Sequence, residues 1–176
     1  AAIASARNGA RTALVERYGF LGGMATMGYV NPISVFTYNN AQVVGGIPWE
    51  FVQRLEKSGG AFIEKPLGNV AFEQEHYKLI AQRMTLESGV DLYMHSYLSG
   101  CVMDGSRIAQ IVIENKNGTE ALSSKVFIDC TGDGDVAFRA GVECNKGDEN
   151  GGMQPPTLMY LMKGVEMQKL RDAICN

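Results

Sequence analysis

The stretch VFIDCTGDGDVAF, residues 126–138, contains the pattern that decides the fold. Its first three residues are apolar, which is typical of a central parallel strand covered on both faces. The glycines that follow permit a tight turn, and the residues from Val136 onward predict a helix. A buried strand that leads through a glycine and carboxylate turn into a helix builds nucleotide sites in α/β proteins. We therefore expect an α/β fold with a nucleotide-facing turn at residues 129–135.

The polar groups of this turn suit a nucleotide. Thr131 offers a hydroxyl, and the helix that follows offers unpaired backbone amides to an anion. Asp133 and Asp135 are unfavourable beside phosphates, so they fit either as acceptors for the hydroxyls of a sugar or ribityl chain or as caps of the helix. Cys130, in the apolar segment, is expected to pack as a small hydrophobic residue.

The beginning of the chain predicts a second strand end at the same edge of the sheet. Small residues at positions 1–8 allow a helix to lie close to a sheet, and Gly9 supplies the left-handed position that ends it. Residues 12–15 then form a short buried strand. Glu16 follows this strand, where a dinucleotide fold places a carboxylate that accepts both hydroxyls of a ribose. The alternative is an ordinary helix and strand followed by a surface glutamate.

The spacing of small residues at Ala2, Ala6 and Gly9 matches the helix that follows a GxGxxG turn. We therefore expect the first strand and the glycine turn of the fold to lie before Ala1. The chain also stops without a signal that ends a helix, so we expect it to be truncated at both ends.

Two glycine-containing segments follow Glu16. Gly22 and Gly23 allow a close backbone approach to a ligand, and Thr26 adds a hydroxyl nearby, although a flexible loop is the alternative. Residues 28–46 are aromatic and rich in Asn, without periodicity. This apolar loop could either line a ring-binding cavity or cover a seam between domains.

The middle of the chain predicts a helical insertion at about residues 46–89. Pro48 suits the first position of a helix that runs to about Lys57. A second helix is expected from Glu73 to Ser88, and it places one apolar stripe on a shared face, formed by Leu79, Ile80 and Met84.

Strands are expected after the insertion. An alternating strand is predicted from Val90 to Tyr97. Alternating residues at 107–113 and 120–125 flank a hairpin turn at 115–118, which predicts a small β-meander.

Composition excludes several classes of protein. The 176 residues are 45% apolar, enough for one sizeable core, and the net charge of −3 gives no basic field for nucleic acid. No apolar run approaches the roughly 18 residues of a membrane span, and no secretion signal opens the chain, so we expect a cytoplasmic protein. We expect no metal site, because the cysteines form no CxxC pair and the histidines are isolated. These residues are Cys101, Cys130, Cys144, Cys175, His76 and His95.

Four blocks in sequence order resemble the FAD-dependent oxidoreductase family, of the glutathione-reductase-like flavoproteins. They are ARNGARTALVER at 6–17, GFLGGMAT at 19–26, VVGGIP at 43–48 and FIDCTGDGD at 127–135. The resemblance covers nearly the whole chain. It implies a Rossmann-like FAD-binding fold with a central parallel sheet, in which residues 1–150 form the FAD-binding domain and residues 151–176 begin a substrate domain.

The resemblance also implies a set of cofactor-binding residues. Glu16 is expected at the adenosine ribose, and the backbone of Leu98 near the adenine. The other expected FAD contacts are Arg17, Gly22, Gly23, Thr26, Thr131, Gly132 and Asp133. Catalytic residues do not follow from the sequence, and no metal is expected.

The expected activity is flavin-mediated hydride transfer to or from a small organic substrate. The flavin N5 accepts or donates the hydride, so the protein need not supply a nucleophile. The alternatives are a flavin-binding electron-transfer subunit without its own substrate chemistry, an NAD-dependent dehydrogenase and a methyltransferase. The meander favours FAD over NAD, and the long glycine-rich turn suits a dinucleotide better than a sulfonium ligand. The oligomeric state does not follow from the sequence.

Overall fold

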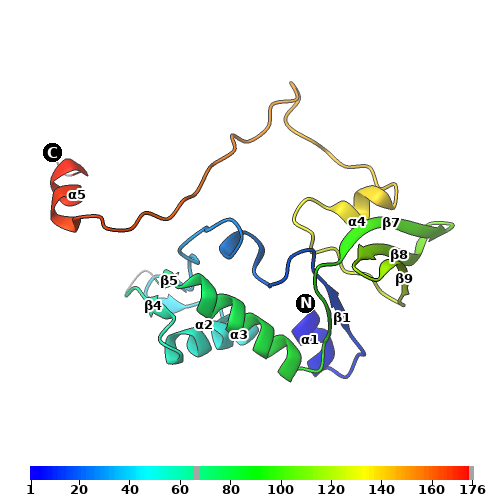
Figure 1. Cartoon of the computed structure of the whole chain (residues 1–176), viewed down its shortest axis with the longest axis horizontal. Coiled ribbons are helices and arrows are strands. Elements are labelled where there is room, and N and C mark those ends of the chain that lie inside the picture. The colour runs from blue at the N-terminus through cyan, green and yellow to red at the C-terminus, as the bar shows by residue number, and fades with distance from the viewer. Residues whose placement is uncertain (66–67, 175–176) are drawn as a thin grey trace.

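The computed structural model describes residues 1–65 and 68–174 of the chain. Figure 1 shows two groups of elements with the N-terminal helix and strand between them. One group contains the two longest helices and a hairpin, and the other contains a three-stranded meander with a short helix. Beyond the short helix the chain runs away from both groups to a terminal helix, α5 (Met167–Ile174).

The N-terminal segment pairs with a strand far along the sequence. Helix α1 (Ala2–Arg7) ends before Gly9, whose φ of 87° confirms the predicted left-handed position. Strand β1 (Ala13–Val15) then pairs in parallel with β6 (Asp91–Tyr93), with Ala13 opposite Asp91 and Val15 opposite Tyr93. The predicted strand is present, but its predicted burial is wrong, because β6 is its single partner in the described chain and Ala13 is exposed. Because the pair is parallel, the carboxyl ends of both strands lie at one edge.

The predicted helical insertion is present and contains the buried core. Helix α2 (Gly46–Lys57) begins two residues before Pro48, and α3 (Gln74–Glu87) begins after its N-cap Glu73. Between them, β4 (Ala61–Ile63) and β5 (Val70–Phe72) form an antiparallel hairpin. The largest buried cluster joins both helices to this hairpin and consists of Leu55, Phe72, Ile80 and Met84.

The aromatic loop at residues 28–46 covers this insertion. It contains a short hairpin of β2 (Thr37–Tyr38) and β3 (Ala41–Gln42), preceded by a 3-10 turn at Gly23–Ala25. Phe36 is buried, with its ring centroid 5.6 Å from that of Trp49. Asn31 Nδ2 donates to the carbonyl of Phe72 at 2.7 Å. Of the two interpretations of this loop, these contacts favour a cover over a cavity lining.

An ion-pair network ties α1 to the insertion. Arg7 donates from Nη1 and Nη2 to the two carboxylate oxygens of Glu50 on α2, at 2.6 and 2.9 Å. Arg54 bonds to the same carboxylate and also pairs with Glu87 on α3. The hydrogen bond from Arg7 lowers the pKa of Glu50. The network therefore fixes the C-terminal end of α1 on both insertion helices.

The predicted meander is confirmed and gains a third strand. It contains β7 (Tyr97–Asp104), β8 (Arg107–Asn115) and β9 (Gly118–Ser123), all antiparallel. The expected single strand from Val90 to Tyr97 is instead divided between β6 and β7, because His95 takes a φ of 50° between them. Helix α4 (Asp135–Arg139) packs on β7, and Arg139 Nη1 donates to the carbonyl of Ser99 at 2.8 Å.

The prediction of a central parallel sheet with a buried strand at residues 126–128 is wrong for the described chain. The parallel sheet has two strands, and Val126 and Ile128 are 70% and 60% exposed. An apolar strand needs a neighbour for its backbone hydrogen bonds, and no described segment pairs with these residues. The adjoining Cys130 is also exposed, which corrects its assignment to a buried strand. Cys175 lies outside the described residues.

The buried face of α3 is narrower than the predicted stripe, and this difference can be tested. Met84 is fully buried, whereas Leu79 is 47% exposed. Replacing Met84 by Ala removes apolar contacts and leaves a cavity, so we expect a loss of about 2–5 kcal/mol in the free energy of unfolding. Replacing Leu79 by Ala should cost less than about 1 kcal/mol. Urea unfolding of both variants measures the two losses, and equal losses would contradict the assigned faces.

Candidate functional site

Glu16 lies where β1 and β6 end. Its backbone N–H donates to the carbonyl of Tyr93 at 2.9 Å, and its carbonyl accepts from the N–H of Ser96 at 3.0 Å. Both bonds continue the strand pairing beyond Val15. The side-chain atom Glu16 Oε1 accepts from the N–H of Tyr18 at 2.9 Å. Within residues 1–65 and 68–174, Oε2 accepts no hydrogen bond, so one carboxylate oxygen is available to a ligand.

The residues after Glu16 contact one another and a neighbouring loop. The guanidinium of Arg17 lies over the Tyr18 ring, 4.9 Å from its centroid. The Tyr18 carbonyl accepts from the N–H of His95 at 3.1 Å. A Cβ on Gly19 would lie 2.5 Å from His95 Nε2, so a larger residue there would require the His95 ring to move. These contacts join the segment to the loop that connects β6 to β7.

Gly22, Gly23 and Thr26 occupy one turn but have different surroundings. Thr26 is 2% exposed, and its hydroxyl donates to the carbonyl of Leu21 at 3.1 Å. A Cβ on Gly22, at φ 122°, would lie 2.5 Å from Thr26 Cγ2. A Cβ on Gly23 would meet no atom within 4 Å. Thr26 therefore holds the turn together, Gly22 allows its close packing, and the backbone at Gly23 is open to a ligand.

The turn at residues 129–135 is organised by Asp129, which the sequence analysis did not single out. Asp129 Oδ1 accepts from the N–H and the hydroxyl of Thr131, at 3.0 and 2.7 Å. Asp129 Oδ2 accepts from the N–H groups of Val136 and Ala137, both at 3.0 Å. An Asp two residues before Thr is a signal for an Asx-turn, and this signal could have identified it.

These bonds shift the pKa of Asp129. Burial alone would raise its pKa, but the three backbone amides and the Thr131 hydroxyl stabilise the ionised form and lower the pKa overall. The ionised carboxylate of Asp129 therefore occupies backbone amides of the turn and of α4.

The expected free amides and hydroxyl of this turn are already engaged. Asp129 takes the first amides of α4, and the Thr131 hydroxyl donates to Asp129 while accepting from the N–H of Asp135 at 2.8 Å. The side chain of Asp135 makes no capping bond, so the interpretation of Asp135 as the helix cap is wrong. Asp133 is exposed and makes no side-chain hydrogen bond within the described ranges. Gly132, at φ 91°, has no atom within 4 Å of an added Cβ.

Strand β7 connects the two carboxylate regions. It begins directly after Ser96, which bonds to Glu16, and it carries Leu98, half-buried and opposite Ile113 of β8. Farther along β7, the Cys101 thiol donates to the carbonyl of Val136 on α4, with the sulfur at 3.7 Å. Strand β7 and the residue before it thus contact both Glu16 and the helix that follows the turn at residues 129–135.

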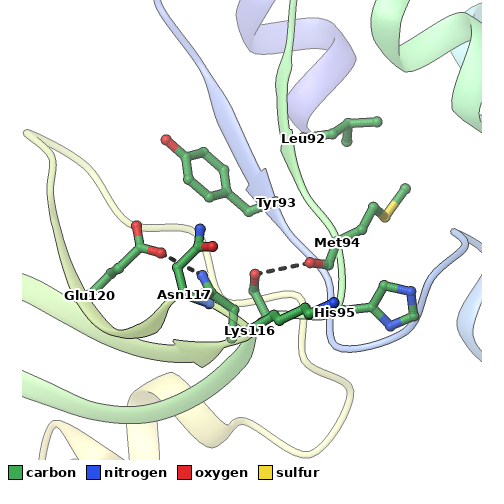
Figure 2. Close-up of a pocket in the computed structure, with 9 residues that line it drawn as sticks. Leu92, Tyr93, Met94, His95, Lys116, Asn117 and Glu120 are labelled. Carbon is green, nitrogen blue, oxygen red and sulfur yellow. Dashed lines mark hydrogen bonds between the residues drawn. The ribbon is translucent and has the colours of Figure 1, made fainter.

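A shallow open pocket of about 320 Å³ lies at the carboxyl end of β6. Tyr93, Asn117 and Glu120 line it, and Figure 2 shows the Tyr93 ring above Asn117 and Glu120, whereas the His95 ring points away. The polar groups partly satisfy each other, because Asn115 Nδ2 donates to Glu120 Oε1 at 2.7 Å. Neither Glu16 nor Thr131 lines this pocket. It adjoins Glu16 through the Glu16–Tyr93 and Glu16–Ser96 backbone bonds.

The part of the chain that the structure describes contains no group of three or more His, Cys, Asp or Glu side chains placed to hold a metal ion. No helix in this part is long and apolar enough to cross a membrane.

The chain matches one family model and is similar in fold to solved structures. A family model described as FAD dependent oxidoreductase matches residues 1–176. The crystal structure of Thermovibrio ammonificans THI4 is similar over 81% of this chain and 58% of that chain, with a TM-score of 0.56 and 18% identity. CabE, an aromatic hydroxylase from angucycline biosynthesis, is similar over 80% of this chain and 30% of its own, with a TM-score of 0.54 and 15% identity. No curated protein matches the sequence.

The role of Asp129 in the turn predicts a local change when its charge is removed. Replacing Asp129 by Asn leaves one side-chain acceptor oxygen in place of two, so the bonds to Thr131 and to α4 cannot all form. We expect about 1 kcal/mol of local stability to be lost, seen as faster hydrogen exchange at Val136 and Ala137. Asp133→Asn is the matched control and should leave both amides unchanged.

Acid should also weaken the turn, because it protonates Asp129. Because the folded pKa of Asp129 is lowered, its contribution is present above the ordinary Asp pKa of about 3.9 and is lost as the pH falls through the folded value. Exchange at Val136 and Ala137, corrected for its intrinsic pH dependence, should therefore rise only in strong acid. Equal protection in the Asp129→Asn variant and the wild-type protein would contradict the capping role.

Proposed function

Because this chain belongs to the FAD-dependent oxidoreductase family, we propose that it binds FAD and takes part in hydride transfer to or from a small organic molecule. It spans 58% and 30% of the two solved chains it resembles, so the activity of the whole protein is part of this proposal. The observation that carries it is the carboxylate of Glu16, which has one oxygen free at the shared end of two parallel strands.

The residues present fit the adenosine half of FAD. Ligands of open α/β sheets bind outside the carboxyl ends of the strands, where Glu16 lies. A carboxylate only accepts hydrogen bonds, which matches the two donor hydroxyls of a ribose. The adjacent pocket beside Tyr93 offers space for an adenine ring, with the backbone of Leu98 at the start of β7 nearby in sequence. Arg17 extends from the same strand end and supplies positive charge near the phosphates.

The two open glycine turns fit the pyrophosphate and ribityl parts. The backbones at Gly23 and Gly132 meet no other atoms at the position of a Cβ, so a ligand can approach them closely. Asp133 is free to accept hydroxyl protons of a ribityl chain. Gly22, Thr26 and Thr131 contribute by shaping these turns, since the hydroxyls of both threonines are already bonded within the chain.

The bound flavin would supply the hydride acceptor or donor. The residues described here then have a binding and orienting role, because they hold the nucleotide portion and leave substrate recognition to other residues. We propose that residues 151–174 begin the substrate-binding part. This segment exposes many apolar side chains, among them Met153, Leu158 and Tyr160, and such side chains are usually covered in a complete domain.

A substitution at Glu16 tests the proposal directly. Glu16→Gln in the complete gene product replaces an acceptor-only group by an amide that cannot accept equally from both ribose hydroxyls. Since hydrogen bonds to charged groups contribute about 1.5–3 kcal/mol, we expect FAD affinity to fall roughly 10-fold or more. Quenching of flavin fluorescence measures the dissociation constant.

The control for this test is Glu56→Gln, which makes the same chemical change on the exposed side of α2. It should leave the affinity unchanged. A wild-type protein that purifies without flavin absorbance and does not bind added FAD would sink the proposal. Anaerobic reduction of the bound flavin by a panel of small metabolites then separates an enzyme from an electron-transfer subunit, which no metabolite would reduce.

A further inference from the structure

A chain of cation and aromatic contacts joins the insertion helix α3 to the segment that follows Glu16. The ammonium of Lys78 on α3 lies over the Phe20 ring, 4.2 Å from its centroid. Phe20 stacks with Tyr18 at a centroid distance of 5.9 Å and an interplanar angle of 11°. The Tyr18 N–H donates to Glu16 Oε1 at 2.9 Å. The charge on α3 thus lies three contacts away from the Glu16 carboxylate.

A second residue of α3 lies close to the same segment. Tyr77 precedes Lys78, and a Cβ on Gly22 would lie 2.9 Å from Tyr77 Cε1. Burial raises the pKa of Tyr77, in keeping with a ring packed against Phe51 and Phe72 in the insertion core. Tyr77 therefore holds α3 close to the glycine turn, and Lys78 extends from it over Phe20. The packing of Tyr77 in the core therefore fixes the part of α3 that carries the Lys78 ammonium.

The Lys78 side chain is 21% exposed, so its surroundings cover most of it. Its ammonium also donates to Glu75 Oε1 at 2.6 Å, in a pair whose acidic member is 73% exposed. An exposed ion pair of this kind contributes little to stability. The contact with Phe20 is partly shielded from water and gains from the quadrupole of the ring. The two interactions of Lys78 can be separated, because different substitutions remove each one.

We propose that Lys78 is a positioning residue for Glu16. Through Phe20 and Tyr18 it keeps the Tyr18 N–H on one carboxylate oxygen, which directs the other oxygen to the ligand. This inference rests on the proposed role of Glu16 in holding the ribose of FAD. It gives the insertion a function in cofactor binding, since a residue of α3 sets the geometry of a carboxylate at the end of β1.

The experiment compares three substitutions in the complete gene product. Lys78→Met keeps the length and helix propensity of the side chain and removes the cation. Lys78→Arg keeps a cation that also favours aromatic faces. Glu75→Gln removes the charged partner of Lys78 and leaves the contact with Phe20. The readouts are the hydrogen exchange of the Tyr18 amide in the flavin-free protein and the dissociation constant for FAD.

A cation over an aromatic ring contributes about 0.5–1 kcal/mol at partly exposed sites, which corresponds to a factor of about 2 to 5. Lys78→Met should therefore speed exchange at Tyr18 and weaken FAD binding by about this factor. Lys78→Arg should restore both values, and Glu75→Gln should match wild type. Exchange within α3 should be the same in all variants, which shows that the helix remains folded.

Three results would overturn the proposal: unchanged exchange at Tyr18 in Lys78→Met, faster exchange with unchanged FAD affinity, or equal weakening by Glu75→Gln. The failure of the proposed function is a different result, because a wild-type protein with no affinity for FAD would show it before any variant is made. In that case the exchange at Tyr18 still decides whether Lys78 holds the segment.

Discussion

The parallel pairing of β1 with β6 is the constraint on which the rest of the structure depends. Each strand has three residues, yet the pairing continues past them through the backbone bonds of Glu16 to Tyr93 and Ser96. This extension fixes where Glu16 lies and where β7 starts. Because β7 pairs with β8 of the meander and also contacts α4, the same strand links the turn at residues 129–135 to Glu16.

A pair of strands this short cannot be stable by itself, so its support comes from the insertion. The buried core lies between α2, α3 and the hairpin of β4 and β5, and Arg7 joins α1 to that core through Glu50. Lys78 and Tyr77 reach the segment after β1 from the same helix. The insertion therefore supports the described chain, and the edge at which β1 and β6 end is attached to it through these contacts.

The sequence predicted the local elements better than their assembly. Periodicity and glycine positions were enough for α2, α3 and the hairpin of β8 and β9, because helix and turn formation depend on nearby residues. The prediction of a buried strand at residues 126–128 was wrong for a different reason. An apolar run indicates a tendency to be buried, but a strand also needs a neighbouring strand for its backbone hydrogen bonds. At the candidate site, the predicted position of Glu16 after a strand is confirmed, and its role in binding stays a prediction. Asp129 was missed because its partners extend eight residues along the chain, to Ala137.

Glu16 and Asp129 show how the same functional group comes to serve two purposes. Both carboxylates follow a segment of apolar residues and precede a glycine turn. All four recorded bonds to Asp129 come from its own turn and helix, so its charge is used within the fold. Glu16 accepts a single bond inside the described chain, from the Tyr18 N–H, and that bond orients the carboxylate without consuming it. A carboxylate held at one oxygen and free at the other is arranged to receive a ligand, whereas one saturated at both oxygens stabilises a turn. The number of acceptor positions left open, more than the presence of the acid, is therefore what makes Glu16 the proposed binding residue and Asp129 a structural one.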